Sequence, residues 1–223
     1  MRAFPGKLLF QPGAGRAGVA VAALAITALC WAWSLGVAAH LHHGAGLWPL
    51  FGMWAVMMAG TMIPPELPAL LRFAPREAAV FTGGYLLPWV AFSLAAAAGQ
   101  SALREAGLLD HRMALVGAAL PAAVLAVPGL CQLTPLKRAC LLRCRGAAAI
   151  PARLPSAIAA GLASVGSCGL LMLVLFATGV MNVAAMVALT LLLVLERALP
   201  ARYPVSSVAG LALLACAVAR LLA

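Results

Sequence analysis

Long apolar segments, separated by short polar ones, recur along the whole chain of 223 residues. Each is about 20 residues long, the length that a helix needs to cross the hydrocarbon core of a bilayer. None alternates apolar and polar residues as the strands of a membrane barrel do. The pattern therefore predicts an all-α, polytopic transmembrane helix bundle, with residues 1–223 forming one integral membrane domain. We expect about seven spans, at 18–39, 47–64, 79–101, 113–133, 157–177, 180–197 and 205–222.

The distribution of charge predicts how this bundle is oriented. The chain has 15 lysines and arginines but only 5 acidic residues. If the N-terminus lies inside, only Arg104, Arg112 and Arg220 fall outside. The other basic residues then lie inside, in places such as a tail over 1–17 and a loop over 134–156. Inner loops carry this excess of positive charge, so we expect an inside N-terminus and an outside C-terminus. The net charge of +10 is thus a topology signal, and no nucleic-acid partner is expected.

Composition narrows the classes of function. Hydrophobic residues make up 65% of the chain and charged residues 9%. Seven spans leave only short loops, which cannot hold a soluble catalytic or nucleotide-binding domain, and there is no Gly-rich phosphate loop. No histidine lies inside a predicted span to ligate haem, and no carboxylates pair for a di-iron site. We therefore expect a protein that is not an enzyme.

The stretch "MWAVMMAGTMIPPELP", residues 53–68, carries a cluster of methionines. Met53 and Met57 are spaced i, i+4 on one side of a helix, and Met58 and Met62 have the same spacing on another side. Each pair could offer two thioethers to Cu(I), which selects soft ligands, or it could simply fill an apolar core. The prolines that follow, Pro64, Pro65 and Pro68, predict the inner end of this helix. Among them, Glu66 either is solvated at the head groups, which is the expected arrangement, or faces the bundle as an ion or proton ligand.

The segment "TPLKRACLLRCRG", residues 134–146, predicts a short amphipathic helix against the inner leaflet. Leu136, Cys140 and Cys144 share one side, and Lys137 faces elsewhere, toward anionic lipid. The two cysteines could form a two-thiolate Cu(I) site or pack on an apolar face.

Other candidate ligands lie elsewhere in the chain. His40, His42 and His43 form either a weak metal site or a solvated outer loop. Cys168 and Met172 are again spaced i, i+4. Gln132 and Asn182 are expected to make hydrogen bonds between helices.

Four stretches together resemble a known family. They are "MWAVMMAGTMIPPELP", "GGYLLPWVAFSLAAAAGQ", "CQLTPLKRACLLRCRG" and "CGLLMLVLFATGVMNVAAMVALTLLLVLERALP". In this order they are similar to an uncharacterised bacterial family of predicted metal-binding integral membrane proteins, often labelled copper chaperones. The resemblance covers residues 47–200 and implies a multi-pass protein of the bacterial cytoplasmic (inner) membrane. The soft groups within it that could ligate copper (Cu+) are Met57, Met58, Met62, Cys140, Cys144, Cys168, Met172 and Met181.

Three positions depart from the family pattern. Many members carry a CxGCC run where this chain has "SVGSCG", so Ser164 and Ser167 stand in place of cysteines beside Cys168. Thr61 stands in place of a methionine. Hydroxyl oxygens are poor Cu(I) ligands, so the resemblance is compatible with weak metal binding or with loss of the site.

We expect membrane-embedded chaperoning or transport of a soft metal, with Cys168 as the best single ligand and Cys140 and Cys144 as a separate inner relay. A copper-receiving protein is then the expected partner beside the lipid bilayer. The alternative is an accessory or assembly subunit of a larger membrane complex, because small residues and methionine suit helix packing.

Overall fold

The computed structural model describes residues 13–38, 46–110, 112–146, 153–180, 182–199 and 203–222. These residues form helices, apart from connecting turns and one isolated bridge between Leu109 and Leu115. The helices are α1 (Gly13–Ala38), α2 (Leu47–Leu70), α3 (Pro75–Glu105), α4 (Ala119–Leu133), α5 (Pro135–Gly146), α6 (Leu154–Met172), α7 (Val174–Thr178), α8 (Val183–Ala198) and α9 (Val205–Leu222). The predicted all-α fold is confirmed for this part of the chain.

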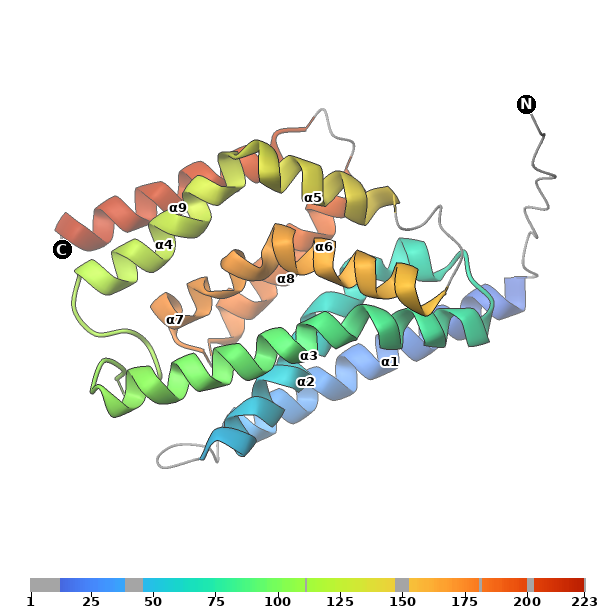
Figure 1. Cartoon of the computed structure of the whole chain (residues 1–223), viewed down its shortest axis with the longest axis horizontal. Coiled ribbons are helices and arrows are strands. Elements are labelled where there is room, and N and C mark those ends of the chain that lie inside the picture. The colour runs from blue at the N-terminus through green and yellow to red at the C-terminus, as the bar shows by residue number, and fades with distance from the viewer. Residues whose placement is uncertain are drawn as a thin grey trace.

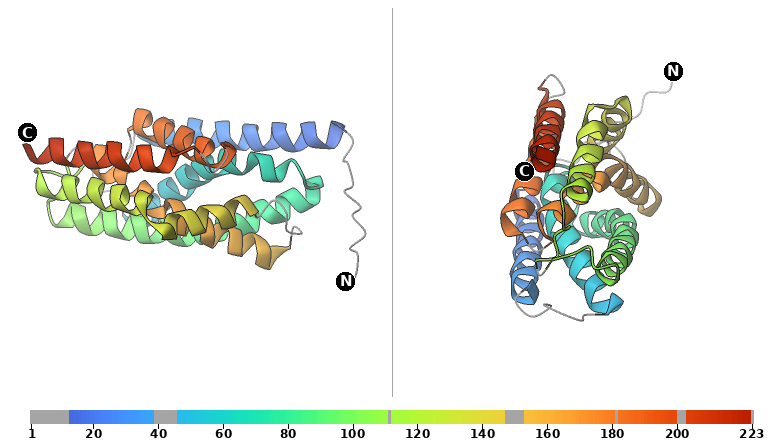
Figure 2. Two further views of the ribbon diagram at one scale, coloured as in Figure 1. Left: turned by 90° about the horizontal axis from the view of Figure 1, so that it is seen from above. Right: turned by 90° about the vertical axis from the view of Figure 1, so that its left-hand side faces the viewer.

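Most of the helices run along the long axis of the molecule (Figures 1 and 2). α4 and α9 lie side by side on one flank, and α1 packs on α2 at the opposite flank. α3 lies beside α2 and α6, and α8 packs mainly against α2. The main core is therefore enclosed by α2, α3, α6, α7 and α8, and it is filled chiefly by aromatic residues, leucines and methionines.

Several helices are suited to a membrane. In the described residues, five are long and apolar enough to cross a bilayer: Gly15–Gly36, Leu47–Leu70, Pro75–Glu105, Leu154–Thr178 and Val205–Leu222. A sixth span is possible if α4 and α5, which bend by 68° at their junction, are counted together. α8 has 16 residues, fewer than the roughly 20 of a full span. The count of seven and the orientation remain predictions.

The prolines of α2 do not end the helix, so that prediction was wrong. α2 continues through Pro64, Pro65 and Pro68 to Leu70. Proline has no N–H to donate to the carbonyl four residues before it, so Pro64 leaves the Gly60 oxygen without its helical partner. The indole Nε1 of Trp31 in α1 donates to this oxygen at 3.2 Å. Gly60 allows the approach, because a Cβ there would lie 2.9 Å from Cβ of Cys30 and Cδ1 of Trp31.

Replacing Trp31 by phenylalanine should therefore destabilise the bundle by about 1–3 kcal/mol, the usual cost of a buried polar group left without a partner. Trp33→Phe on the same helix is the matched control, because Trp33 is 44% exposed. Unfolding of the purified protein in mixed micelles measures both variants. Equal stability of the two would contradict a structural role for the Trp31–Gly60 bond.

Candidate metal site

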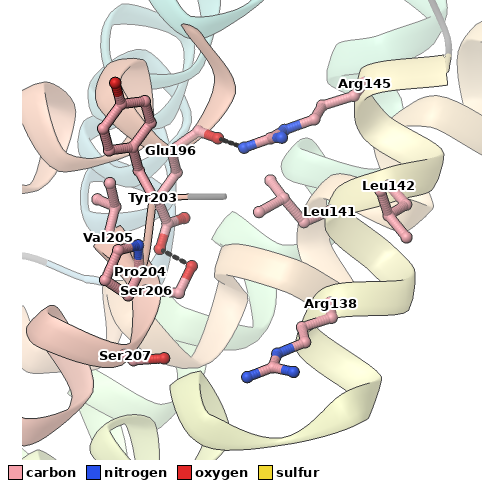
Figure 3. A pocket seen from close by; sticks show the side chains of 10 residues that line it. All are labelled: Arg138, Leu141, Leu142, Arg145, Glu196, Tyr203, Pro204, Val205, Ser206 and Ser207. Atoms are coloured by element: carbon pink, nitrogen blue, oxygen red, sulfur yellow. Dashed lines mark hydrogen bonds between the residues drawn. The ribbon is translucent and has the colours of Figure 1, made fainter. Parts of the chain in front are cut away.

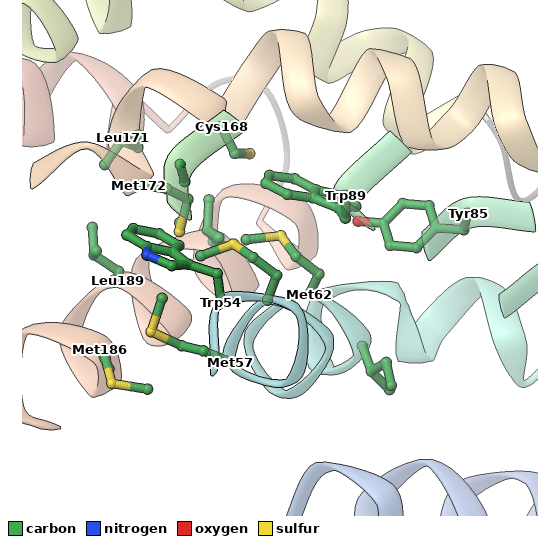
Figure 4. Packing of buried hydrophobic residues seen from close by; sticks show 14 of the residues in the cluster. Trp54, Met57, Met62, Tyr85, Trp89, Cys168, Leu171, Met172, Met186 and Leu189 are labelled. Atoms are coloured by element: carbon green, nitrogen blue, oxygen red, sulfur yellow. The ribbon is translucent and has the colours of Figure 1, made fainter. Parts of the chain in front are cut away.

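The predicted methionines lie in the main core (Figure 4). Met53, Met57, Met58 and Met62 are each at most 2% exposed. Met172 of α6 and Met186 of α8 meet them around Trp54. The Trp54 ring stacks on Phe176 with the centroids 5.4 Å apart, and its Nε1 donates to Oε1 of Gln100 at 2.6 Å. Core packing is thus sufficient to explain why these methionines are buried, whether or not they also bind a metal.

The cysteines of α5 face α6. The Sγ of Cys144 lies 3.8 Å from the Oγ of Ser167, and this Oγ lies 3.0 Å from the Sγ of Cys168. Cys144 and Cys168 are 4% and 1% exposed. Cys140 lies one helical turn before Cys144 and packs against Gly166 of α6. A Cβ added at Gly166 would lie only 3.2 Å from the Sγ of Cys140. The expected separation of Cys140 and Cys144 from Cys168 is therefore wrong, because α5 docks directly onto Gly166–Cys168 of α6.

The donor set in the described residues is small. They contain no group of three or more His, Cys, Asp or Glu side chains placed to hold one metal ion. A site built from the cysteines therefore rests on the Cys144–Cys168 pair, with thioethers as the remaining soft donors. Met181 and the histidines at 40, 42, 43 and 111 lie outside the described residues.

A buried lysine stands next to the cysteines. Lys137 is 0% exposed, so its predicted position facing lipid head groups is wrong. Its Nζ donates to the carbonyl oxygen of Ser167 at 2.8 Å and to Oε2 of Glu196 at 2.7 Å. Glu196 also accepts hydrogen bonds from Gln132 at 3.0 Å and from Ser206 at 2.8 Å. A charge at this depth is costly unless it is paired, and here each charge has its partner.

A second ion pair lies next to the first along α8. Arg197 pairs with Glu66 of α2, which is 4% exposed, so the expected solvation of Glu66 is wrong and its side chain faces the bundle, as in the alternative. Arg197 also donates to the Oγ of Ser164 at 2.7 Å and to the Tyr85 hydroxyl at 3.3 Å. Sequence reasoning counted Arg197 only as one of the inner basic residues and gave it no place in a site. The available signal was that position 197 falls within the predicted span 180–197, and ionisable side chains within a span usually face the bundle interior.

The positions that depart from the family pattern have distinct surroundings. Ser167 lies between the two buried cysteines, whereas the Ser164 hydroxyl lies 2.7 Å from the Tyr85 hydroxyl. The Thr61 hydroxyl donates to the carbonyl of Met57 in its own helix at 2.8 Å. Of these three positions, only Ser167 would bring a sulfur side chain directly between Cys144 and Cys168.

Both predicted polar side chains make a hydrogen bond to another helix. The expected bond of Gln132 to another helix is confirmed, because its Nε2 donates to Glu196 of α8. Asn182 joins α7 to α8: its Nδ2 donates to the carbonyl of Thr178 at the end of α7 at 3.2 Å, and its Oδ1 caps the start of α8 by accepting from the N–H of Ala185 at 3.1 Å. An amide at a helix start is a common N-cap, since it satisfies a free backbone donor.

Comparison with known proteins extends this description. The searches of curated proteins and of solved structures each gave no match. A family model described as copper chaperone matches residues 51–220, which is most of the chain. The match includes α9, which lies beyond residues 47–200, where the sequence resemblance was found. The matched region contains the cysteines of α5 and α6, the methionines of α2 from Met53 onward, and both buried ion pairs. The chain therefore belongs to the PpoB2 family of copper chaperones.

Proposed function

We propose that the protein binds Cu(I) inside a membrane-embedded helical bundle and passes it on, with the thiolates of Cys144 and Cys168 as its main ligands. The observation that carries the proposal is that both buried thiols contact one hydroxyl, that of Ser167. Thiolates and thioethers are the soft ligands that favour Cu(I) over harder metals. Copper is the cargo here, and the protein is proposed to have no catalytic role.

The charge beside the thiols supports this assignment. The Lys137 ammonium is bonded to the carbonyl of Ser167, the residue directly before Cys168. A positive charge close to a cysteine favours the thiolate, which is the form that binds metal, and here it partly offsets the burial of both side chains, which favours the neutral thiol. Because Lys137 is held by Glu196, its position does not depend on the metal.

A route to the buried pair begins at Cys140. A cleft of about 640 Å³ between α5 and α6 is lined by Cys140, Arg143 and Ser156 among others. Cys140 is partly exposed there, and Cys144 follows one helical turn further along α5. We infer that Cys140 receives the ion first and that Cys144 and Cys168 hold it. The methionines of α2 and Met172 would offer weaker thioether contacts beyond them.

Substituting Cys168 by serine should lower Cu(I) affinity by at least about tenfold, since even outer contacts of a metal site commonly have that effect. Cys216→Ser is the matched control, because Cys216 lies exposed on α9. Protein purified in mild detergent under reducing, oxygen-free conditions is titrated with Cu(I) against a competing chelator. If Cys168→Ser binds copper as wild type does, the ligand assignment fails.

The accessory-subunit alternative has one observation in its favour. Only 17% of the most apolar stretch of α1 and 11% of that of α9 is buried, so both flanks of the bundle present apolar helices that another membrane protein could cover. Methionine in the core then acts purely as packing. The same titration separates the two functions, since wild-type protein without Cu(I) affinity would favour the accessory role.

A further inference from the structure

A second cleft, of about 330 Å³, lies between α5 and the start of α9 (Figure 3). This volume is near the lower end of the range for small-ligand sites. Arg138 and Arg145 enter the cleft from α5, and Ser207 lies across from Arg138 in the first turn of α9. No part of the copper proposal uses these three side chains.

The cleft carries an excess of positive charge. Its acidic side chain, Glu196, is already paired with Lys137 and accepts from Ser206. Arg138 is exposed, and within the described ranges its side chain has no ion-pair partner. Arg145 donates to the backbone carbonyl of Glu196, but its Nε is buried with no partner in the described residues. Two guanidinium groups that still have hydrogen-bond donors without a partner therefore line the same cleft.

The other donors and the rim suit a phosphate group attached to an apolar body. The hydroxyl of Ser207 adds a hydrogen-bond donor, and this residue lies in the first turn of α9, where backbone N–H groups have no partner within the helix. Leu142, which also lines the cleft, is 59% exposed and sits on the same helix as both arginines. Basic side chains beside exposed apolar ones are the usual arrangement where a protein meets anionic lipid.

We propose that this cleft is a binding site for a phosphate group held by Arg138, Arg145 and Ser207. The apolar rim favours the head group of an anionic phospholipid over soluble phosphate as its source. The guanidinium of Arg138 would contact the phosphate oxygens directly, because planar guanidinium groups match the geometry of this anion.

The test uses full-length protein in detergent and native mass spectrometry with added phosphatidylglycerol, phosphatidylcholine or inorganic phosphate. Wild type should bind phosphatidylglycerol in preference to phosphatidylcholine. Arg138→Gln should weaken that binding about fivefold, the factor expected for one basic residue at an anionic surface. Arg143→Gln is the matched control, because Arg143 lies on the same helix but lines the cleft of Cys140.

The outcomes separate the two sources of phosphate. Loss of phosphatidylglycerol binding in Arg138→Gln, with no competition by inorganic phosphate, supports the site and identifies a lipid. Binding of inorganic phosphate that Arg138→Gln weakens, without preference for phosphatidylglycerol, supports the site and identifies a soluble ligand. Equal binding by wild type and Arg138→Gln, or equal loss in Arg143→Gln, overturns the proposal.

Discussion

Replacing Lys137 by methionine is expected to lower the free energy of unfolding by about 3–5 kcal/mol, the cost of removing one partner of a buried ion pair. Methionine is similar to the aliphatic part of the lysine side chain but has no ammonium group, so it leaves Glu196, which is 1% exposed, charged and without its cation. Gln132 and Ser206 donate to Glu196, yet neither neutralises it. Unfolding of the purified protein in mixed micelles, followed by circular dichroism, measures the loss.

Two further variants test whether the pair itself is responsible. Adding Glu196→Gln to Lys137→Met removes both charges, and the amide can still accept a hydrogen bond from Ser206. The double variant should recover most of the lost stability, because a pair is costly to break but not always costly to replace. Arg138→Gln, at the next and exposed position, should change stability by no more than about 0.5 kcal/mol. A single variant as stable as wild type would show that Lys137 is not buried against Glu196.

The helices were predictable because their signal is local. An apolar run of sufficient length indicates a helix whatever surrounds it, and the last one, 205–222, has the predicted bounds. α2 shows where such reasoning fails. Proline removes a hydrogen bond, which predicts a helix end, but a side chain from α1 supplies the missing donor to Gly60. Sequence near the prolines carries no sign of Trp31.

The buried charges were not predictable for a related reason. Glu66 and Lys137 each look like surface residues when only their neighbours in the chain are considered. Their partners, Arg197 and Glu196, are far away in sequence and adjacent to each other at the end of α8. Only the packing of α2 and α5 around α8 brings the pairs together, and apolar periodicity does not specify that packing.

The candidate metal site was predictable in part. The i, i+4 spacing of Cys140 and Cys144 correctly placed both cysteines on a short helix starting at Pro135. The spacing could not predict how that helix is oriented, and so could not predict which surface its cysteine side contacts. α5 turns by 68° from α4, and Gly166 leaves room for Cys140, so the cysteine side meets Ser167 instead of the membrane surface.

Ser167→Cys is expected to raise Cu(I) affinity by at least about tenfold, since changes next to a metal commonly alter its affinity by this factor or more. The Oγ that it replaces lies 3.0 Å from the sulfur of Cys168 and 3.8 Å from that of Cys144. A sulfur at this position would be a third soft donor in place of an oxygen that Cu(I) binds poorly. Competition titration with a Cu(I) chelator measures the change.

The gain must depend on position and not on one more thiol. Ser101→Cys is the matched control, because Ser101 lies near the end of α3 and bonds only to Glu105 in the described residues. It should leave Cu(I) affinity unchanged, whereas Cys144→Ser in the Ser167→Cys protein should cancel the gain. If Ser167→Cys binds Cu(I) no more tightly than wild type, the thiols of Cys144 and Cys168 do not form the site, even though both contact the hydroxyl that was replaced.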